Sequence, residues 1–182
     1  MKIGIFGGAF DPPHIAHTLS CLYALETSDI EQIWVIPCYK HAFAKDLTGY
    51  SHRVEMCRIA MKCFGDKVII SEIESERTEI SYTIDTLKIL KERNPQDTFT
   101  LIIGTDILAE IDKWKDFDKI KEIAEVLVLP RPIDKNNLSE ENFFMPNISS
   151  RMIRELLKNN KDSSQFLSKK VLQYIKENHL YK

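Results

Sequence analysis

The sequence of 182 residues lacks the features that mark several large classes of protein. Its four cysteines show no CxxC spacing, and no basic stretch with an apolar core opens the chain, so two disulfides in a secreted protein are the less favoured interpretation. No apolar run approaches the roughly 18 residues that suggest a membrane span. The formal net charge of −2 argues against the broad positive surface of a protein that binds DNA, RNA or an anionic membrane. We therefore expect a reduced, cytoplasmic protein whose phosphate binding is local.

The composition that remains is that of an ordinary globular protein. Hydrophobic residues make up 43% of the chain and charged residues 29%. A domain of this length buries roughly 70% of the surface that its unfolded chain exposes, so a core forms without cross-links. Because no repeat, low-complexity tract or linker divides the sequence, we expect one domain over residues 1–182, with a helical C-terminal segment from residue 149.

Short apolar runs alternate with segments in which apolar residues recur at helical spacing. The apolar runs predict buried strands at residues 2–6, 33–36, 68–70, 99–103 and 126–129. Ser51 and Ser81 are suitable N-caps for two of the intervening helices, and two more helices follow Ser149. This alternation predicts an α/β fold, with a doubly wound parallel sheet of five or six strands and C-terminal helices.

The expected sheet also predicts where a ligand binds. Ligands of doubly wound sheets lie beyond the carboxyl ends of the strands, at the point where the strand order reverses. The residues expected near this crevice are Gly7, Gly8, His14, Pro37, Gly104 and Asp106. The polar segment from residue 38 to residue 50 has no clear period, and we expect it to be a loop on the ligand side.

The segment GGAFDPPHIAH, residues 7–17, follows the first predicted strand. Glycine lets the backbone approach a phosphate closely, and the start of a helix, with Pro12 and Pro13 in its first turn, presents N–H groups to an anion. His14 and His17 are three residues apart and share one helical face. The segment therefore predicts a triphosphate site. It matches neither GxGxxG nor a P-loop, however, and the alternatives are a plain turn and a pair of metal-binding histidines.

A second segment, ISSRMIR at residues 148–154, begins a helix near the end of the chain. Ser149 or Ser150 can cap this helix, and either hydroxyl, together with backbone N–H groups, can hold phosphate oxygens. Arg154, one turn inward, adds a fork of donors. The alternative is an ordinary capped helix with surface arginines.

Together the two segments resemble the signatures of the nucleotidyltransferase superfamily, an HxGH-like turn and an ISSTxIR-like helix. Between them, four further motifs are similar to the nicotinate-nucleotide adenylyltransferase family, and the resemblance extends through almost the entire chain. These motifs are SHRVEM at residues 51–56, ISYTIDTL at residues 80–87, IGTD at residues 103–106 and Lys113-Trp114. The chain departs from the family pattern at Ala16, where glycine is expected, at Arg151, where threonine is usual, and at Lys115, where an aromatic residue or histidine is frequent.

The resemblance implies a Rossmann-like domain that transfers the adenylyl group of Mg-ATP to nicotinate mononucleotide, giving deamido-NAD and pyrophosphate. It implies that His14, His17 and Arg154 are catalytic and that Mg²⁺ enters with ATP. The residues that it places on ATP are Gly7, Gly8, Phe10, His14, His17, Asp106, Ser149, Ser150 and Arg154. Those that it places on the acceptor are Thr83, Trp114, Tyr82 and Lys45. The expected partners are thus ATP and a mononucleotide, without DNA, RNA or a membrane.

The acceptor phosphate is itself a nucleophile, so the reaction needs alignment and charge stabilisation by imidazolium, arginine, backbone N–H groups and Mg²⁺, and no covalent protein intermediate. His52 and Arg53 are expected to form a helix start with a surface charge. Related transferases acting on nicotinamide mononucleotide or phosphopantetheine, a cytidylyltransferase and a silent ATP-binding homologue remain alternatives. So does a metal-dependent hydrolase that uses His14, His17 and Asp11 or Asp106. The oligomeric state, including a homo-oligomer, is left open.

Overall fold

The computed structural model describes residues 1–40, 47–108, 111–130 and 145–182. Five strands form one parallel sheet in the order β3-β2-β1-β4-β5. The strands are β1 (Lys2–Gly8), β2 (Gln32–Pro37), β3 (Val68–Ile70), β4 (Thr98–Gly104) and β5 (Ala124–Leu129). The predicted α/β fold with a doubly wound parallel sheet is therefore confirmed, with five strands, and its order is that of a Rossmann-like sheet.

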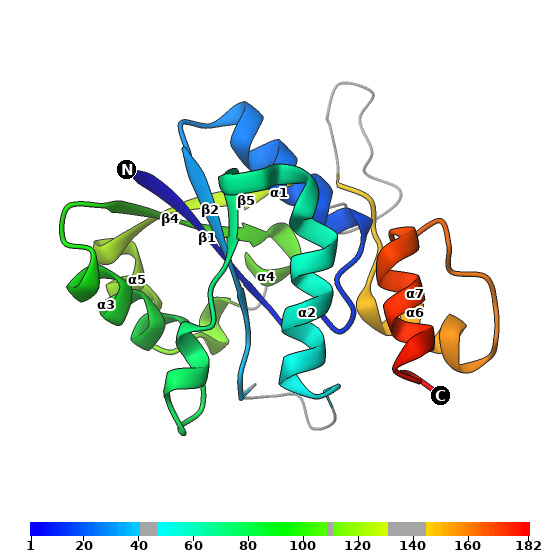
Figure 1. Cartoon of the computed structure of the whole chain (residues 1–182). Coiled ribbons are helices and arrows are strands. Elements are labelled where there is room, and N and C mark those ends of the chain that lie inside the picture. Colours follow the sequence, from blue (N-terminus) through cyan, green and yellow to red (C-terminus); the bar gives the residue numbers. More distant parts are fainter. Residues whose placement is uncertain (41–46, 109–110, 131–144) are drawn as a thin grey trace.

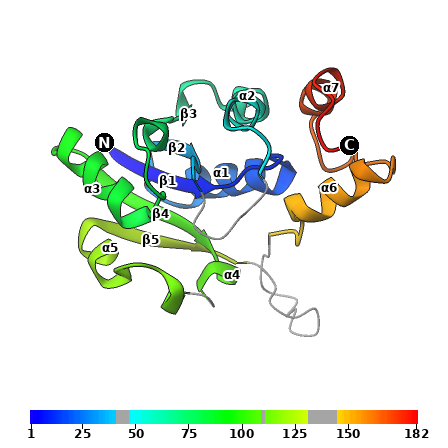
Figure 2. The same cartoon turned by 90° about the horizontal axis from the view of Figure 1, so that it is seen from below.

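Helices cover both faces of this sheet (Figures 1 and 2). The α-helices are α1 (Ile15–Thr27), α2 (Tyr50–Met61), α3 (Thr83–Arg93), α4 (Thr105–Leu108), α5 (Phe117–Ile123), α6 (Ser150–Lys158) and α7 (Lys169–Glu177). Short 3₁₀ helices are η1 (Lys62–Lys67), η2 (Ile73–Glu76) and η3 (Ile111–Lys113). Buried residues of α1 and α2 pack on one face, and those of α3 and α5 pack on the other. In β1 the side chains alternate accordingly, with Ile3 and Ile5 toward α3 and Phe6 toward α1.

The C-terminal helices form a third cluster on the outer side of α2. Met56 of α2 is fully buried against Ile153 of α6 and against Val171 and Ile175 of α7. The two predicted C-terminal helices are therefore confirmed, and Ser149 is the N-cap of α6, with its Oγ accepting the N–H of Met152 at 3.2 Å. Figure 2 shows α6 and α7 beside the end of the sheet where the central strands finish.

Three helix starts differ from the sequence prediction by one or two residues. The N-cap of α2 is Gly49 and not Ser51, and the N-cap of α3 is Tyr82 and not Ser81. Ser81 cannot cap because its N–H donates to the carbonyl of Lys40 at 3.0 Å and its hydroxyl accepts from the N–H of Lys40. The two prolines precede the N-cap of α1, His14, instead of lying in its first turn.

Two further expectations concern the whole chain. All four cysteines are free, as predicted for a reduced protein, so the two-disulfide alternative is wrong. Among the described helices, none is long and apolar enough to cross a membrane.

The strand register shows where the order of the sheet reverses. Pairing between β1 and β4 runs from Lys2 opposite Thr98 to Ile5 opposite Leu101. Beyond this point β1 pairs with β2 as far as Gly8 opposite Pro37, and β4 pairs with β5 as far as Gly104 opposite Leu129. The carboxyl ends of the two central strands thus turn to different neighbours, which is the feature that makes this edge the binding edge of a doubly wound sheet.

Candidate active site

The turn that follows β1 is built around a buried aromatic ring. Phe10 has a φ of 48°, in the left-handed region that non-glycine residues rarely adopt, and its side chain is 1% exposed. Its ring packs edge-on against Phe6 at 5.5 Å and against His17 at 4.9 Å between centroids. The buried ring of Phe10 therefore supports the backbone of the turn and the ring of His17. It is not exposed to contact a ligand.

The two histidines of the first signature lie against each other at the start of α1. Their rings stack at 3.8 Å between centroids, and the backbone N–H of His14 donates to Nδ1 of His17 at 3.1 Å. A nitrogen that accepts this hydrogen bond carries no proton, so the ring proton of His17 is on Nε2. The geometry therefore favours a neutral Nε2–H donor in place of the expected imidazolium.

The alternative metal site gains no support from this geometry. The backbone hydrogen bond occupies Nδ1 of His17. Within the described part of the chain, no group of three or more His, Cys, Asp or Glu side chains is placed to hold a metal ion. The start of α1 is also partly occupied, because Ile15 N–H donates to the carbonyl of Phe166 at 2.9 Å. Side chains must therefore supply much of any anion binding here.

The two glycines before the turn have different surroundings, which gives a testable difference. A Cβ atom on Gly8 would lie 3.2 Å from two ring carbons of Phe10, whereas a Cβ on Gly7 would meet no atom of the described residues within 4 Å. Since the Phe10 ring is held in the core, Gly8→Ala is expected to lower the free energy of unfolding by about 1 to 3 kcal/mol. Gly7→Ala is expected to leave it unchanged, because the methyl group enters open space at the end of β1.

The two changes are expected to affect different properties, with Gly8→Ala lowering stability and Gly7→Ala lowering the affinity for ATP. If ATP lies on the end of β1, the Gly7 methyl group enters its space and weakens ATP binding about tenfold in a protein of normal stability. Thermal unfolding and titration with a non-hydrolysable ATP analogue measure the two effects. Normal ATP affinity in Gly7→Ala would remove Gly7 from the candidate ATP site.

Direct hydrogen bonds join the second signature to the first. Ser150 Oγ donates to the carbonyl of Pro12 at 2.9 Å, across 138 positions of sequence. Arg154 Nη1 donates to the carbonyl of Asp11 at 2.6 Å, across 143 positions. The structure therefore brings together the two segments that the sequence predicted to share a triphosphate. Arg151, by contrast, is an exposed side chain that pairs with Glu155 at 3.3 Å.

Asp11 is the link between these segments, a role that the sequence did not reveal. Its carboxylate is fully buried, and Oδ2 lies 3.5 Å from Nη1 of Arg154. The same carboxylate accepts the N–H of Thr48 at 3.4 Å and the hydroxyl of Tyr181 at 2.7 Å. Asp11 thus orients Arg154 through Nη1 of its guanidinium.

Arg53 corrects the expectation of a surface charge at the start of α2. The side chain is 1% exposed, and its three nitrogens donate to three backbone carbonyls at 2.8 to 2.9 Å. These carbonyls belong to Ala9 in the first signature, Cys38 after β2 and Thr48 before α2. One guanidinium therefore fixes three loops at the binding edge of the sheet.

The expected acceptor residues gather at the start of α3. Thr83 is the first residue of α3, and Tyr82 is its N-cap. Lys115, next to Trp114, places its Nζ 3.1 Å from Asp85 Oδ2 and 4.6 Å from the centroid of the Tyr82 ring. The family departure at Lys115 thus ties the half-buried Trp114 segment to the first turn of α3.

Two expected site residues cannot be placed in this arrangement. Lys45 lies outside the described residues. Asp106 follows β4 in the backbone of α4, as predicted, but its side chain is outside what the structure describes.

A short segment after β2 connects the acceptor side to the phosphate side. Cys38 N–H donates to the carbonyl of Gly8 at 2.9 Å, and Ser81 N–H donates to the carbonyl of Lys40 at 3.0 Å. The buried carboxylate of Glu74, which the sequence did not single out, accepts the N–H of Tyr39 at 3.1 Å. Burial, together with that carboxylate, raises the pKa of the Cys38 thiol to about 12, so the thiol stays protonated and is no nucleophile.

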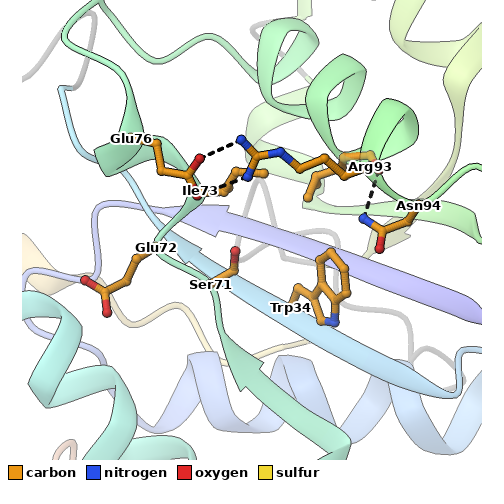
Figure 3. Close-up of a pocket in the computed structure, with 8 residues that line it drawn as sticks. Trp34, Ser71, Glu72, Ile73, Glu76, Arg93 and Asn94 are labelled. Atoms are coloured by element: carbon orange, nitrogen blue, oxygen red, sulfur yellow. Dashed lines mark hydrogen bonds and ion pairs between the residues drawn. The ribbon is translucent and has the colours of Figure 1, made fainter.

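Two hollows in the surface lie away from the signature residues. Figure 3 shows one of about 300 Å³ between η2 and the end of α3, where Arg93 forms two hydrogen bonds with Glu76, at 3.0 and 2.6 Å. A second, of about 720 Å³, lies between the ends of α6 and α7. Neither is lined by a residue of the two signatures.

Comparisons with known proteins show the family of the chain. Residues 5–156 match the family model described as cytidylyltransferase-like. The nicotinate-nucleotide adenylyltransferase of Bacillus subtilis is 35% identical over 186 residues, which cover 99% of this chain and 98% of that protein. The probable nicotinate-nucleotide adenylyltransferase of Myxococcus xanthus is 33% identical over 186 residues, covering 100% and 95%.

A solved structure of a similarly named enzyme has the same fold. The nicotinic acid mononucleotide adenylyltransferase of Plasmodium falciparum, complexed with NaAD, superposes with a TM-score of 0.85 at 27% identity, covering 99% of this chain and 97% of that one. The likeness in sequence and in structure therefore spans the whole chain, both signatures included. The chain belongs to the cytidylyltransferase-like family and, within it, to the nicotinate-nucleotide adenylyltransferases.

Proposed function

We propose that the protein transfers the adenylyl group of ATP to the phosphate of nicotinate mononucleotide, forming deamido-NAD and releasing pyrophosphate. The observation that carries this function is the direct joining of the two signatures through Ser150 and Arg154 at the binding edge of the sheet. The relatives that match over the full chain carry the name of this activity, and a structural neighbour binds its product, NaAD.

The reaction needs no covalent protein intermediate. An oxygen of the acceptor phosphate attacks the α-phosphorus of ATP, a new P–O bond forms, and the bond to the oxygen bridging the α- and β-phosphates breaks as pyrophosphate leaves. We assign the donor role at the triphosphate to Nε2–H of His17, to His14 and to the guanidinium of Arg154. Ser149 and Ser150 hold the first turn of α6 where its N–H groups can meet phosphate oxygens. Mg²⁺ bound to ATP would offset the charge of the phosphates.

The acceptor is assigned from the geometry at α3. The N-terminus of a helix carries a partial positive charge, which favours a carboxylate over a neutral amide. Thr83 begins this helix, and the carboxylate of Asp85 in its first turn is paired with the ammonium group of Lys115, so the favourable charge comes from the helix end itself. We therefore assign the pyridine carboxylate to the N–H groups and hydroxyl near Thr83, and the ring to the face of Trp114. This arrangement favours nicotinate over nicotinamide mononucleotide.

Pyrophosphate release tests the proposal directly. Purified protein receives Mg-ATP and, in separate reactions, nicotinate mononucleotide, nicotinamide mononucleotide or phosphopantetheine, and the mass of each product is measured. We expect release with nicotinate mononucleotide and formation of its adenine dinucleotide. Turnover with another acceptor alone would keep the mechanism and replace the substrate, whereas ATP binding without turnover would favour a silent ATP-binding homologue.

A further inference from the structure

The end of the chain returns to the turn of the first signature. Tyr181 is the second-to-last residue, and its hydroxyl donates to Oδ1 of Asp11 at 2.7 Å, across 170 positions of sequence. Asp11 is fully buried, and its other oxygen faces Nη1 of Arg154 at 3.5 Å. The contact therefore joins the segment after α7 to the buried carboxylate that orients Arg154.

The path of the tail is specified by the fold. After α7 the chain turns back with His179 and Tyr181 in the left-handed region, at φ of 54° and 59°. Leu180 N–H donates to the carbonyl of Ile175 at 3.0 Å, which closes the end of the helix. Non-glycine residues in this region cost free energy, so the contacts at the end of the path must offset that cost.

The phenol is suited to a lasting hydrogen bond with a carboxylate. Burial, reinforced by the adjacent Asp11, raises the pKa of Tyr181 far above its ordinary value. The hydroxyl therefore keeps its proton and remains a donor to Asp11. With Oδ1 held by Tyr181, the carboxylate plane is fixed and Oδ2 stays between Arg154 and the N–H of Thr48.

We propose that Tyr181 is a positioning residue for ATP, which acts through Asp11 to hold Arg154 and the turn that carries His14 and His17. The inference rests on the proposed function in that it takes Arg154 as a phosphate ligand. It goes beyond that function because it gives the segment after α7 a part in ATP binding. It also predicts an effect on one substrate only, since among the described residues no hydrogen bond or ion pair joins Asp11 to Thr83 or Trp114.

The test compares Tyr181→Phe with Tyr174→Phe. Both changes remove one phenol hydroxyl from the C-terminal segment, and Tyr174 hydrogen-bonds His52 of α2 at 2.9 Å, away from Asp11. Tyr181→Phe is expected to raise the KM for ATP, and the Kd of a non-hydrolysable ATP analogue, about fivefold to tenfold. The KM for nicotinate mononucleotide is expected to stay within about twofold of the wild-type value, because the lost hydrogen bond to Asp11 does not involve the proposed acceptor residues. Tyr174→Phe is expected to leave all three constants unchanged.

Specific outcomes would overturn the proposal. Equal constants in the two variants, or a parallel rise of both KM values in Tyr181→Phe, would reduce Tyr181 to a packing residue. The analogue needs no acceptor, so its Kd decides the matter even if the wild-type protein uses another mononucleotide and the proposed acceptor fails. A wild-type protein that bound no ATP analogue would overturn this inference together with the ATP site itself.

Discussion

Replacing His17 by alanine is expected to lower kcat by a factor of about 10² to 10³, because the side chain is proposed to donate a hydrogen bond where charge builds up on the transferring phosphate. The ring is half-buried, stacks on His14 and packs edge-on against Phe10, so thermal unfolding of the variant is measured beside its rate. Steady-state pyrophosphate release at saturating ATP measures the loss.

Two further substitutions distinguish the roles of the two ring nitrogens of His17. Asparagine at position 17 places an acceptor near the Nδ1 position and keeps the hydrogen bond from the N–H of His14, whereas glutamine extends a donor toward the Nε2 position. If Nε2–H is the catalytic donor, His17→Gln retains more activity than His17→Asn, although His17→Asn better preserves the turn. The reverse order would mean that His17 acts by holding the turn, and a near-normal rate in His17→Ala would remove it from catalysis.

The strands and the sheet could be predicted because their signals are local. Residues 33–36 are apolar throughout and residues 99–103 are apolar except for Thr100, as expected for strands covered on both faces. Parallel order follows from the helices between the strands. The helix starts were less certain because caps depend on distant groups. Ser81, for example, is a good capping residue, but the carbonyl and N–H of Lys40 use its polar groups instead.

The candidate site was predictable only where its residues belong to a motif. The sequence predicted His14, His17, Ser149, Ser150 and Arg154 in this way, and hydrogen bonds join their segments. The groups that orient them were missed. Nothing in the sequence links Tyr181 to Asp11, because their contact spans 170 positions and no local pattern marks either partner.

Unlike Tyr181 and Asp11, Arg53 is marked by a pattern in the sequence that indicates a buried position. Arg53, Cys57 and Met61 are spaced at i, i+4 and i+8, and all three are buried on one face of α2. A single charged residue on an otherwise apolar helix face indicates a buried group with fixed partners, since an unpaired buried charge is costly. The sequence alone could not name those partners, which come from three loops.

Replacing Arg53 by methionine is expected to have the largest effect on stability. Methionine fills a similar space but leaves the carbonyls of Ala9, Cys38 and Thr48 without their donors. Buried groups that lose a charged partner cost about 1 to 3 kcal/mol each, and partial relaxation suggests a total loss of about 4 kcal/mol. At about 2 to 4 °C per kcal/mol for a chain of this length, the unfolding temperature is expected to fall by about 10 °C.

The matched control is Arg58→Met on the same helix. Arg58 is exposed and pairs with Glu55 and Glu72 at the surface, so its loss is expected to change stability by no more than about 0.5 kcal/mol. Arg53→Lys keeps the charge but cannot reach three divergent carbonyls, and we expect it to fall between the wild type and Arg53→Met. Below their unfolding temperatures, both Arg53 variants should also bind ATP more weakly, because the carbonyl of Ala9 anchors the phosphate turn. Equal unfolding temperatures for Arg53→Met and Arg58→Met would show that the three loops keep their positions without the buried guanidinium.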